Sequence, residues 1–98
     1  MPFEYSVARA FSLLSIRAHA PSAPGVYGIS NAREWIYIGR SDNIQNALMH
    51  HLTARDPTLA GRRPTGFAFE VCEPDSQAAR CERLIVEYAP VCNPSTDR

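Results

Sequence analysis

Two short runs of β-branched and aromatic residues lie close together in the first half of the chain. Val26 to Ser30 and Trp35 to Gly39 are separated by the four residues Asn31 to Glu34. Runs of this length, bounded by Gly, Pro and Asn, are typical of strands joined by a tight connection. The pattern therefore predicts a β-hairpin.

The register of this hairpin decides where its two tyrosines point, and the sequence leaves it open. A four-residue turn pairs Ser30 with Trp35 and sends Tyr27 and Tyr37 to opposite faces of the sheet. A three-residue loop pairs Ser30 with Glu34 and places Tyr27 opposite Tyr37, because a slip of one residue flips every side chain. A bulge in the first register would have the same effect as the second.

A helix is predicted directly after the hairpin. Ile44, Leu48 and Leu52 recur at helical spacing and indicate a helix from about residue 43 to residue 54. Asp42 followed by Gln45 has the form of a capping box at its start. Residues 53–66, with two prolines and two glycines, form a predicted loop.

The second half of the chain repeats the change from strand to helix. Phe67 to Cys72 predicts a third strand, and the helix that begins at Pro74 runs to about Tyr88, where Pro90 ends it. The first twenty residues are ambiguous, since residues 3–7 alternate like a strand and residues 8–16 could form two helical turns. The order of strands and helices predicts an α+β fold.

Composition limits the class of protein without naming it. Ninety-eight residues with 45% apolar content make one domain, expected to span residues 1–98. No apolar run is long enough to cross a bilayer and no leader-like segment opens the chain, so the expectation is a soluble, cytoplasmic protein with no membrane partner. Cys72, Cys81 and Cys92 lack metal-binding spacing and are interpreted as small buried hydrophobes.

The charges are balanced overall but unevenly distributed. Residues 1–63 carry seven arginines and four acidic residues, whereas residues 64–98 carry three arginines and six acidic residues; lysine is absent. The guanidinium fork suits bidentate contacts to phosphate. An ordinary mixed surface explains the same pattern, so charge favours nucleic-acid binding only weakly.

Glu82 is the most informative single position among the polar residues. Its helical neighbours Ala78, Ile85 and Val86 form an expected apolar stripe, while Arg80, Arg83 and Glu87 mark the expected wet face. A carboxylate beside a buried stripe is either paired, bound to a cation, or extended to water at the boundary. His51 likewise has two interpretations, a site residue or a histidine satisfied by a backbone carbonyl.

Taken together, four motifs resemble the GIY-YIG nuclease superfamily. They are the triplet GVY at residues 25–27, the triplet YIG at residues 37–39 followed by a helix, Glu82, and the segment PVCN at residues 90–93. The similarity covers about residues 24–93. It implies a small central three-stranded antiparallel sheet flanked by helices, and a nuclease that acts on nucleic acid, in particular DNA.

The resemblance also implies roles for individual residues. Tyr27 and Tyr37 correspond to the motif tyrosines, one of which activates or positions the attacking water, and His51 corresponds to a residue that assists proton transfer. Glu82 corresponds to the carboxylate that holds a divalent cation, Mg²⁺ or Mn²⁺. Gly39 and Asn93 would support the site.

One position departs from the family pattern. Family members carry an arginine on the helix four residues before the position of His51, and here that residue is Ala47. A fixed guanidinium neutralises the charge that develops on the phosphate, and the loss of one such donor typically costs about a hundred- to a thousand-fold in rate. Arg40 is the better candidate to replace the missing guanidinium. Arg55 lies about 12 Å beyond Ala47 along the helix, and Arg33 lies at the hairpin tip.

Three functions remain open at this stage. The chain is a divalent-metal-dependent nuclease, a nucleic-acid-binding module whose phosphodiester hydrolysis is weakened or lost, or an inactive protein-interaction module on the same scaffold. The salt dependence of DNA binding separates them, because phosphate contacts weaken steeply with salt.

Overall fold

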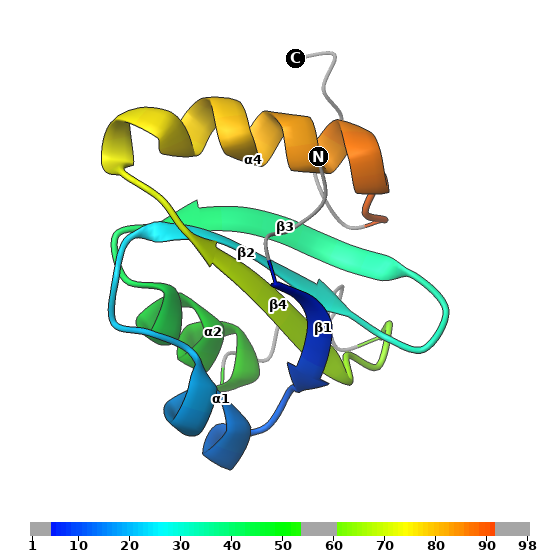
Figure 1. Ribbon diagram of the computed structural model, residues 1–98. Coiled ribbons are helices and arrows are strands. Elements are labelled where there is room, and N and C mark those ends of the chain that lie inside the picture. The colour runs from blue at the N-terminus through cyan, green and yellow to red at the C-terminus, as the bar shows by residue number, and fades with distance from the viewer. Residues whose placement is uncertain (1–4, 54–60, 92–98) are drawn as a thin grey trace.

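A computed structural model describes residues 5–53 and 61–91 of the chain (Figure 1). Seven elements occupy these ranges in the order β1 (Tyr5–Ala10), α1 (Leu13–His19), β2 (Gly25–Ser30), β3 (Trp35–Ser41), α2 (Ile44–Thr53), β4 (Gly66–Val71) and α4 (Pro74–Tyr88). The expected α+β class is confirmed. Asn93 and Arg55 lie outside the described ranges. Within those ranges, no helix has both the length and the apolar character that crossing a membrane requires.

The strands form one antiparallel sheet in the order β1-β4-β2-β3. The three expected strands are present as β4, β2 and β3, but the prediction of three strands missed β1. Its backbone pairs with β4 through an irregular register between Tyr5 and Arg9. That long-range pairing explains why residues of ambiguous local preference form a strand rather than a helix.

The sheet is covered on both faces (Figure 1). The helices α1 and α2 pack on one face, and α4 packs on the other, so the central strand β2 is buried along its whole length. The core on the side of α1 and α2 consists of Ile16, Ala20, Tyr27, Ile29, Ile36, Ile44, Leu48 and Phe67. The core on the side of α4 consists of Val26, Ile38, Ala68, Cys81 and Leu84.

The hairpin contains a bulge that brings its tyrosines to one face. Ser30 pairs with Trp35, as the four-residue turn requires, but Ile29 pairs with Tyr37 and Tyr27 pairs with Gly39. One extra residue on β3 therefore changes the alternation of side chains beyond the turn. Tyr27 and Tyr37 lie diagonally across the two strands, with ring centroids 6.2 Å apart.

The start of α2 differs from the expected capping box. Asn43, not Asp42, precedes the helix, and its side-chain oxygen accepts a hydrogen bond from the Asn46 amide at 2.9 Å. Gln45 does not reach back to the cap, because its Nε2 donates to the Ala20 carbonyl at 3.0 Å. The side chain expected to close the capping box instead ties α2 to the end of α1.

The buried stripe of α4 also lies at different residues from those expected. Gln77, Cys81 and Leu84 are buried, whereas Ala78 is exposed and Val86 is 78% exposed. The expected stripe of Ala78, Ile85 and Val86 was therefore wrong, apart from the half-buried Ile85. Cys81 and Leu84 direct this face into the core, and the buried Gln77 amide is satisfied there because it donates to the Ser41 carbonyl at 3.1 Å.

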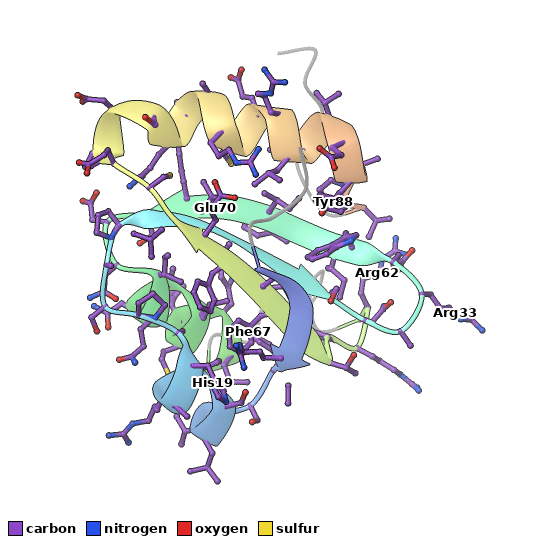
Figure 2. All side chains as sticks on the ribbon, in the orientation of Figure 1. His19, Arg33, Arg62, Phe67, Glu70 and Tyr88 are labelled. Carbon is purple, nitrogen blue, oxygen red and sulfur yellow. The ribbon has the colours of Figure 1, made fainter. Side chains whose placement is uncertain are left out.

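Arg80 was expected on the wet face of α4, and this too was wrong. Its Nε and one terminal nitrogen each donate to a Glu70 carboxylate oxygen at 2.7 Å. Figure 2 shows Glu70 on β4 beneath α4. The bidentate pair links the helix to the sheet with both side chains largely buried.

Candidate active site

A tyrosine–histidine pair joins the sheet to α2. The Tyr27 hydroxyl lies 2.8 Å from Nε2 of His51. Tyr27 is only 4% exposed, while His51, in the last turn of α2, is half-buried. Depending on the histidine tautomer, the hydroxyl donates to Nε2 or accepts from it. This is the arrangement that proton transfer between the two side chains requires.

Tyr37 completes a cluster of three rings. Its ring centroid lies 5.1 Å from that of His51, and Tyr27 lies 5.6 Å from the same imidazole. Tyr37 is half-buried, so part of its ring reaches the surface beside the buried Tyr27. The structure thus brings together Tyr27, Tyr37 and His51, from β2, β3 and α2.

Gly39 leaves the space in which the two tyrosines meet. A Cβ at this position would lie 2.7 Å from the Tyr27 hydroxyl oxygen, 2.7 Å from Cε2 of Tyr37 and 2.9 Å from Cζ of Tyr27. Real Cβ atoms do not approach other atoms this closely. The glycine of the YIG triplet is therefore needed for packing beside the tyrosines, on the same face of the sheet.

Both tyrosines resist ionisation. Burial raises the pKa of Tyr27 well above its ordinary value of 10.0, and the neighbouring Tyr37 and Cys81 act in the same direction. Burial also raises the pKa of Tyr37, with a further contribution from Cys81, while hydrogen bonding with Tyr27 opposes the rise. At neutral pH both side chains carry their protons, so they act as hydroxyl groups rather than as phenolates.

Ala47 lies one helical turn before His51 on α2. It is half-buried and packs against the core on the side of α1 and α2. The side chain at this position therefore faces the sheet on the same stripe as His51. Because alanine has only a methyl group, position 47 of α2 supplies no guanidinium to the tyrosine–histidine cluster.

Arg40 lies on the face of β3 opposite to the tyrosines. Side chains alternate along a strand, so Arg40 shares a face with Ile38, which packs in the core beneath α4. Gly39, between them in sequence, faces the tyrosines. The exposed Arg40 side chain starts on the face opposite to Ala47.

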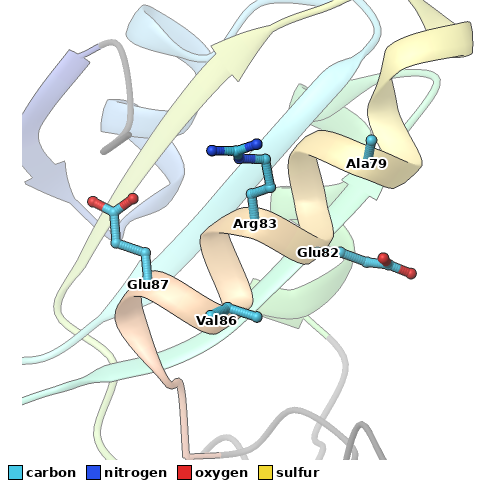
Figure 3. Close-up of a pocket in the computed structure, with 5 residues that line it drawn as sticks. All are labelled: Ala79, Glu82, Arg83, Val86 and Glu87. Atoms are coloured by element: carbon cyan, nitrogen blue, oxygen red, sulfur yellow. The ribbon is translucent and has the colours of Figure 1, made fainter.

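Glu82 lies on α4, which covers the face of the sheet opposite to α2 (Figure 1). The side chain is exposed and borders an open surface groove with Ala79, Arg83, Val86 and Glu87. In Figure 3, Glu82 and Val86 project from one side of the helix, and Arg83 and Glu87 project from the other.

Across residues 5–53 and 61–91, no group of three or more His, Cys, Asp or Glu residues is arranged to hold a metal ion. A cation near Glu82 would therefore take one protein carboxylate and complete its shell with water. Magnesium tolerates such a site, because it retains several of its waters and binds through one or two carboxylates.

The sequence interpretation missed two glutamines that position the site. Gln45 fixes α2 against the end of α1, and Gln77 fixes α4 against the end of β3 at Ser41. A signal for Gln77 was available, since it lies four residues before Cys81 and thus on the same stripe. Gln45 gave no such signal, because its partner is the backbone carbonyl of Ala20 in a distant segment.

The chain is similar to individual known proteins, but no family model matches it. UvrABC system protein C from Hydrogenobaculum sp. (strain Y04AAS1) is 39% identical over 44 residues, a stretch that makes up 45% of this chain and only 8% of that protein.

Solved structures are similar over most of the chain. The magnesium-bound GIY-YIG N-terminal endonuclease domain of UvrC from Thermotoga maritima matches with a TM-score of 0.68 and 27% identity, covering 81% of this chain and 96% of that one. A point mutant of the same domain, bound to its catalytic divalent cation, matches with a TM-score of 0.69 and 27% identity over 82% of this chain. The resemblance to the GIY-YIG nuclease superfamily is confirmed.

Proposed function

We propose that this domain acts on DNA as a GIY-YIG nuclease-type module, with phosphodiester hydrolysis weakened or lost because Ala47 replaces an arginine. The observation that carries the proposal is the 2.8 Å contact between the Tyr27 hydroxyl and Nε2 of His51, with Tyr37 beside it. The similar Thermotoga maritima domain is an endonuclease that binds a catalytic divalent cation.

The chain's own residues account for the proton transfer. The Tyr27 oxygen accepts a proton from a water molecule as its own proton passes to Nε2 of His51, and the water oxygen attacks the phosphorus. The transfer is concerted, because the raised pKa of Tyr27 disfavours a free phenolate. The half-buried Tyr37 orients the water. The bond from phosphorus to the leaving oxygen breaks, and that oxygen takes a proton from solvent.

Glu82 is the residue proposed to hold a cation, Mg²⁺ or Mn²⁺. Glu82 lies on the α4 side of the sheet and His51 on the α2 side, so an ion held by Glu82 would act on a phosphate bound across the edge strand β3. There it would stabilise negative charge on the phosphate and on the leaving oxygen. The exposed Glu82 carboxylate suits a hard cation that keeps most of its waters. Titration with Mn²⁺, followed by paramagnetic broadening of NMR signals, should broaden signals near Glu82 and leave Glu34 sharp. Broadening confined to other acidic residues would reject the assignment.

The direct test of the proposed function is nicking of supercoiled plasmid with magnesium or manganese. The expected result is weak nicking that Glu82→Ala abolishes. Equal and persistent nicking by both proteins would indicate a contaminant or a site elsewhere. Complete inactivity together with salt-dependent DNA binding would leave a binding module.

A protein-interaction module is the second candidate. The observation that favours it is the groove on α4, where Val86 is 78% exposed between charged residues. This function predicts that binding of DNA is absent at every salt concentration, which fluorescence anisotropy of a labelled DNA duplex measures directly.

A further inference from the structure

We infer that the hairpin end of the sheet carries a second DNA-contacting surface, which binds phosphates at a place separate from the tyrosine–histidine cluster. This inference rests on the proposed function and adds to it the place where the substrate is held. The surface, named here the hairpin-end arginine surface, consists of Arg33, Arg62 and Arg63 together with Asn31 and Thr65. These residues line an open pocket at the tip of the β2–β3 hairpin, together with Ala32, Glu34 and Gly61.

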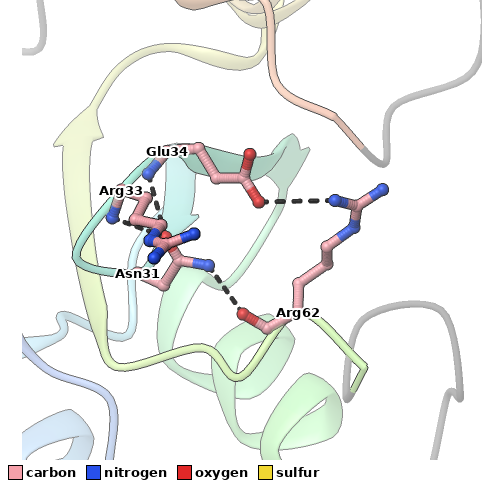
Figure 4. Close-up of polar contacts among 4 residues, drawn as sticks. All are labelled: Asn31, Arg33, Glu34 and Arg62. Carbon is pink, nitrogen blue, oxygen red and sulfur yellow. Dashed lines mark hydrogen bonds and ion pairs between the residues drawn. The ribbon is translucent and has the colours of Figure 1, made fainter.

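The surface is built from two segments that lie far apart in sequence. Asn31 Nδ2 donates to the Arg62 carbonyl at 2.6 Å, and its Oδ1 accepts from the backbone amides of Arg33 and Glu34 at 2.8 and 2.9 Å (Figure 4). The Thr65 amide also donates to the Ser30 carbonyl at 2.9 Å. One asparagine thus fixes the hairpin tip against residues 61–65, which brings the three arginines to the lining of one open pocket.

The backbone at Arg63 adopts a conformation that arginine rarely takes. Its φ is 55°, in the left-handed region that favours glycine. An arginine thus occupies a backbone conformation that glycine would adopt with less strain. The exposed Arg63 side chain projects to solvent beside Arg62, where it gains no burial.

The hairpin-end arginine surface is positively charged, and few ion pairs neutralise it. Among the described residues, Arg33 and Arg63 form no ion pair, and Arg62 approaches only Glu34, at 3.5 Å. That contact is long and exposed, so it contributes little. Figure 2 shows Arg33 and Arg62 projecting from the hairpin end of the molecule. Guanidinium groups arranged in this way suit the oxygens of successive phosphates.

The hairpin tip lies close enough to the tyrosine–histidine cluster for one duplex to reach both. Tyr37 is the third residue of β3 and Glu34 directly precedes that strand, so their backbones are at most about 10 Å apart, with the bulge shortening the path. Each DNA strand carries one phosphate per about 3.4 Å of helix axis, so a short duplex spans this distance. Both surfaces can therefore contact the same DNA molecule. An acidic peptide is the competing ligand for these guanidinium groups.

The test is fluorescence anisotropy of a labelled DNA duplex at several salt concentrations, without divalent metal so that no cleavage occurs. The variant Arg33→Gln with Arg63→Gly removes two charges, and glycine suits the backbone at residue 63. We expect the slope of log affinity against log salt to fall in magnitude by about two, one for each lost phosphate contact. Glu34→Gln should tighten binding, because it frees Arg62.

The matched control is Arg17→Gln, compared with Arg33→Gln alone. Arg17 is exposed on α1 and lies outside the surface, and its substitution removes the same single charge. An equal loss in the control would show that only net charge matters and would overturn the inference. An unchanged slope of log affinity against log salt in the hairpin variant would also overturn the inference, but it would leave the proposed function intact. Equal, arginine-dependent binding of polyglutamate would reject DNA as the ligand, and the absence of any DNA binding would reject both proposals.

Discussion

The Tyr27 hydroxyl lies 2.8 Å from Nε2 of His51 and connects the centre of the sheet to the last turn of α2. The bulge in β3 brings Tyr37 beside this pair, because without it Tyr37 would lie on the opposite face from Tyr27. Coupling between the two residues should be measurable in the folding free energy. Tyr27→Phe alone should cost about 0.5–1.5 kcal/mol.

The coupling is isolated by a double-mutant cycle of Tyr27→Phe and His51→Ala in urea denaturation. We expect an interaction energy of about 0.5–1.5 kcal/mol, since the residues touch directly. His50→Ala serves as the control, because that histidine is exposed and precedes His51 on the same helix. Strict additivity of Tyr27→Phe with His51→Ala would mean that the contact contributes nothing.

Gly39 is expected to be intolerant of even one added methyl group. Gly39→Ala places a Cβ 2.7 Å from both the Tyr27 hydroxyl oxygen and Cε2 of Tyr37, so at least one ring must move. The expected loss of stability is about 1–3 kcal/mol, as for other overpacked sites. Thermal or urea unfolding measures it. In the Tyr27→Phe background the penalty should shrink, and an unchanged melting temperature in Gly39→Ala would contradict the packing described.

The elements of the fold were largely predictable, whereas the face of the sheet on which each hairpin side chain lies was not. The runs at residues 26–30 and 35–39 identified both strands, and the apolar spacing after Asn43 identified α2. The bulge at Ile36, where β3 has one residue more than β2, has no local signal in the sequence.

Long-range polar contacts account for the remaining differences. β1 forms through pairing with β4, and Arg80 turns inward because Glu70 meets it from β4. The cluster of Tyr27, Tyr37 and His51 followed from the motif resemblance rather than from residue spacing. The role of Glu82 stays a prediction, because its carboxylate is exposed on α4 and only a bound cation would test it.

The ion pair between Arg80 and Glu70 should contribute to stability. Glu70→Gln removes the charge but keeps a similar shape, leaving the Arg80 guanidinium without its bidentate carboxylate. We expect a loss of about 1.5–3 kcal/mol in the free energy of unfolding, typical of hydrogen bonds to charged groups. Arg83→Gln on the exposed face of the same helix should change stability by less than about 0.5 kcal/mol. Equal effects would show that α4 does not depend on the pair.

Alkaline pH should destabilise the protein through the buried Tyr27 and the half-buried Tyr37. The pKa values of Tyr27 and Tyr37 are raised above 10.0 in the folded state, so the folded protein keeps protons that the unfolded chain has lost. Their contribution to stability is complete below pH 10 and falls as the pH rises above it. Unfolding at pH 7 to 11 should show this fall, and Tyr27→Phe should reduce it. A decline of the same steepness in the variant would contradict the assignment.

Plasmid nicking by the wild type and three variants tests the central claim most directly. Ala47→Arg places a guanidinium one turn before His51, with its stem along the edge of the core and its charge toward solvent. We predict that it raises the rate about a hundred- to a thousand-fold, that Tyr27→Phe in the same background removes the gain, and that Arg40→Ala changes little. A folded Ala47→Arg protein that cleaves no faster than the wild type would contradict the claim that this position limits the chemistry.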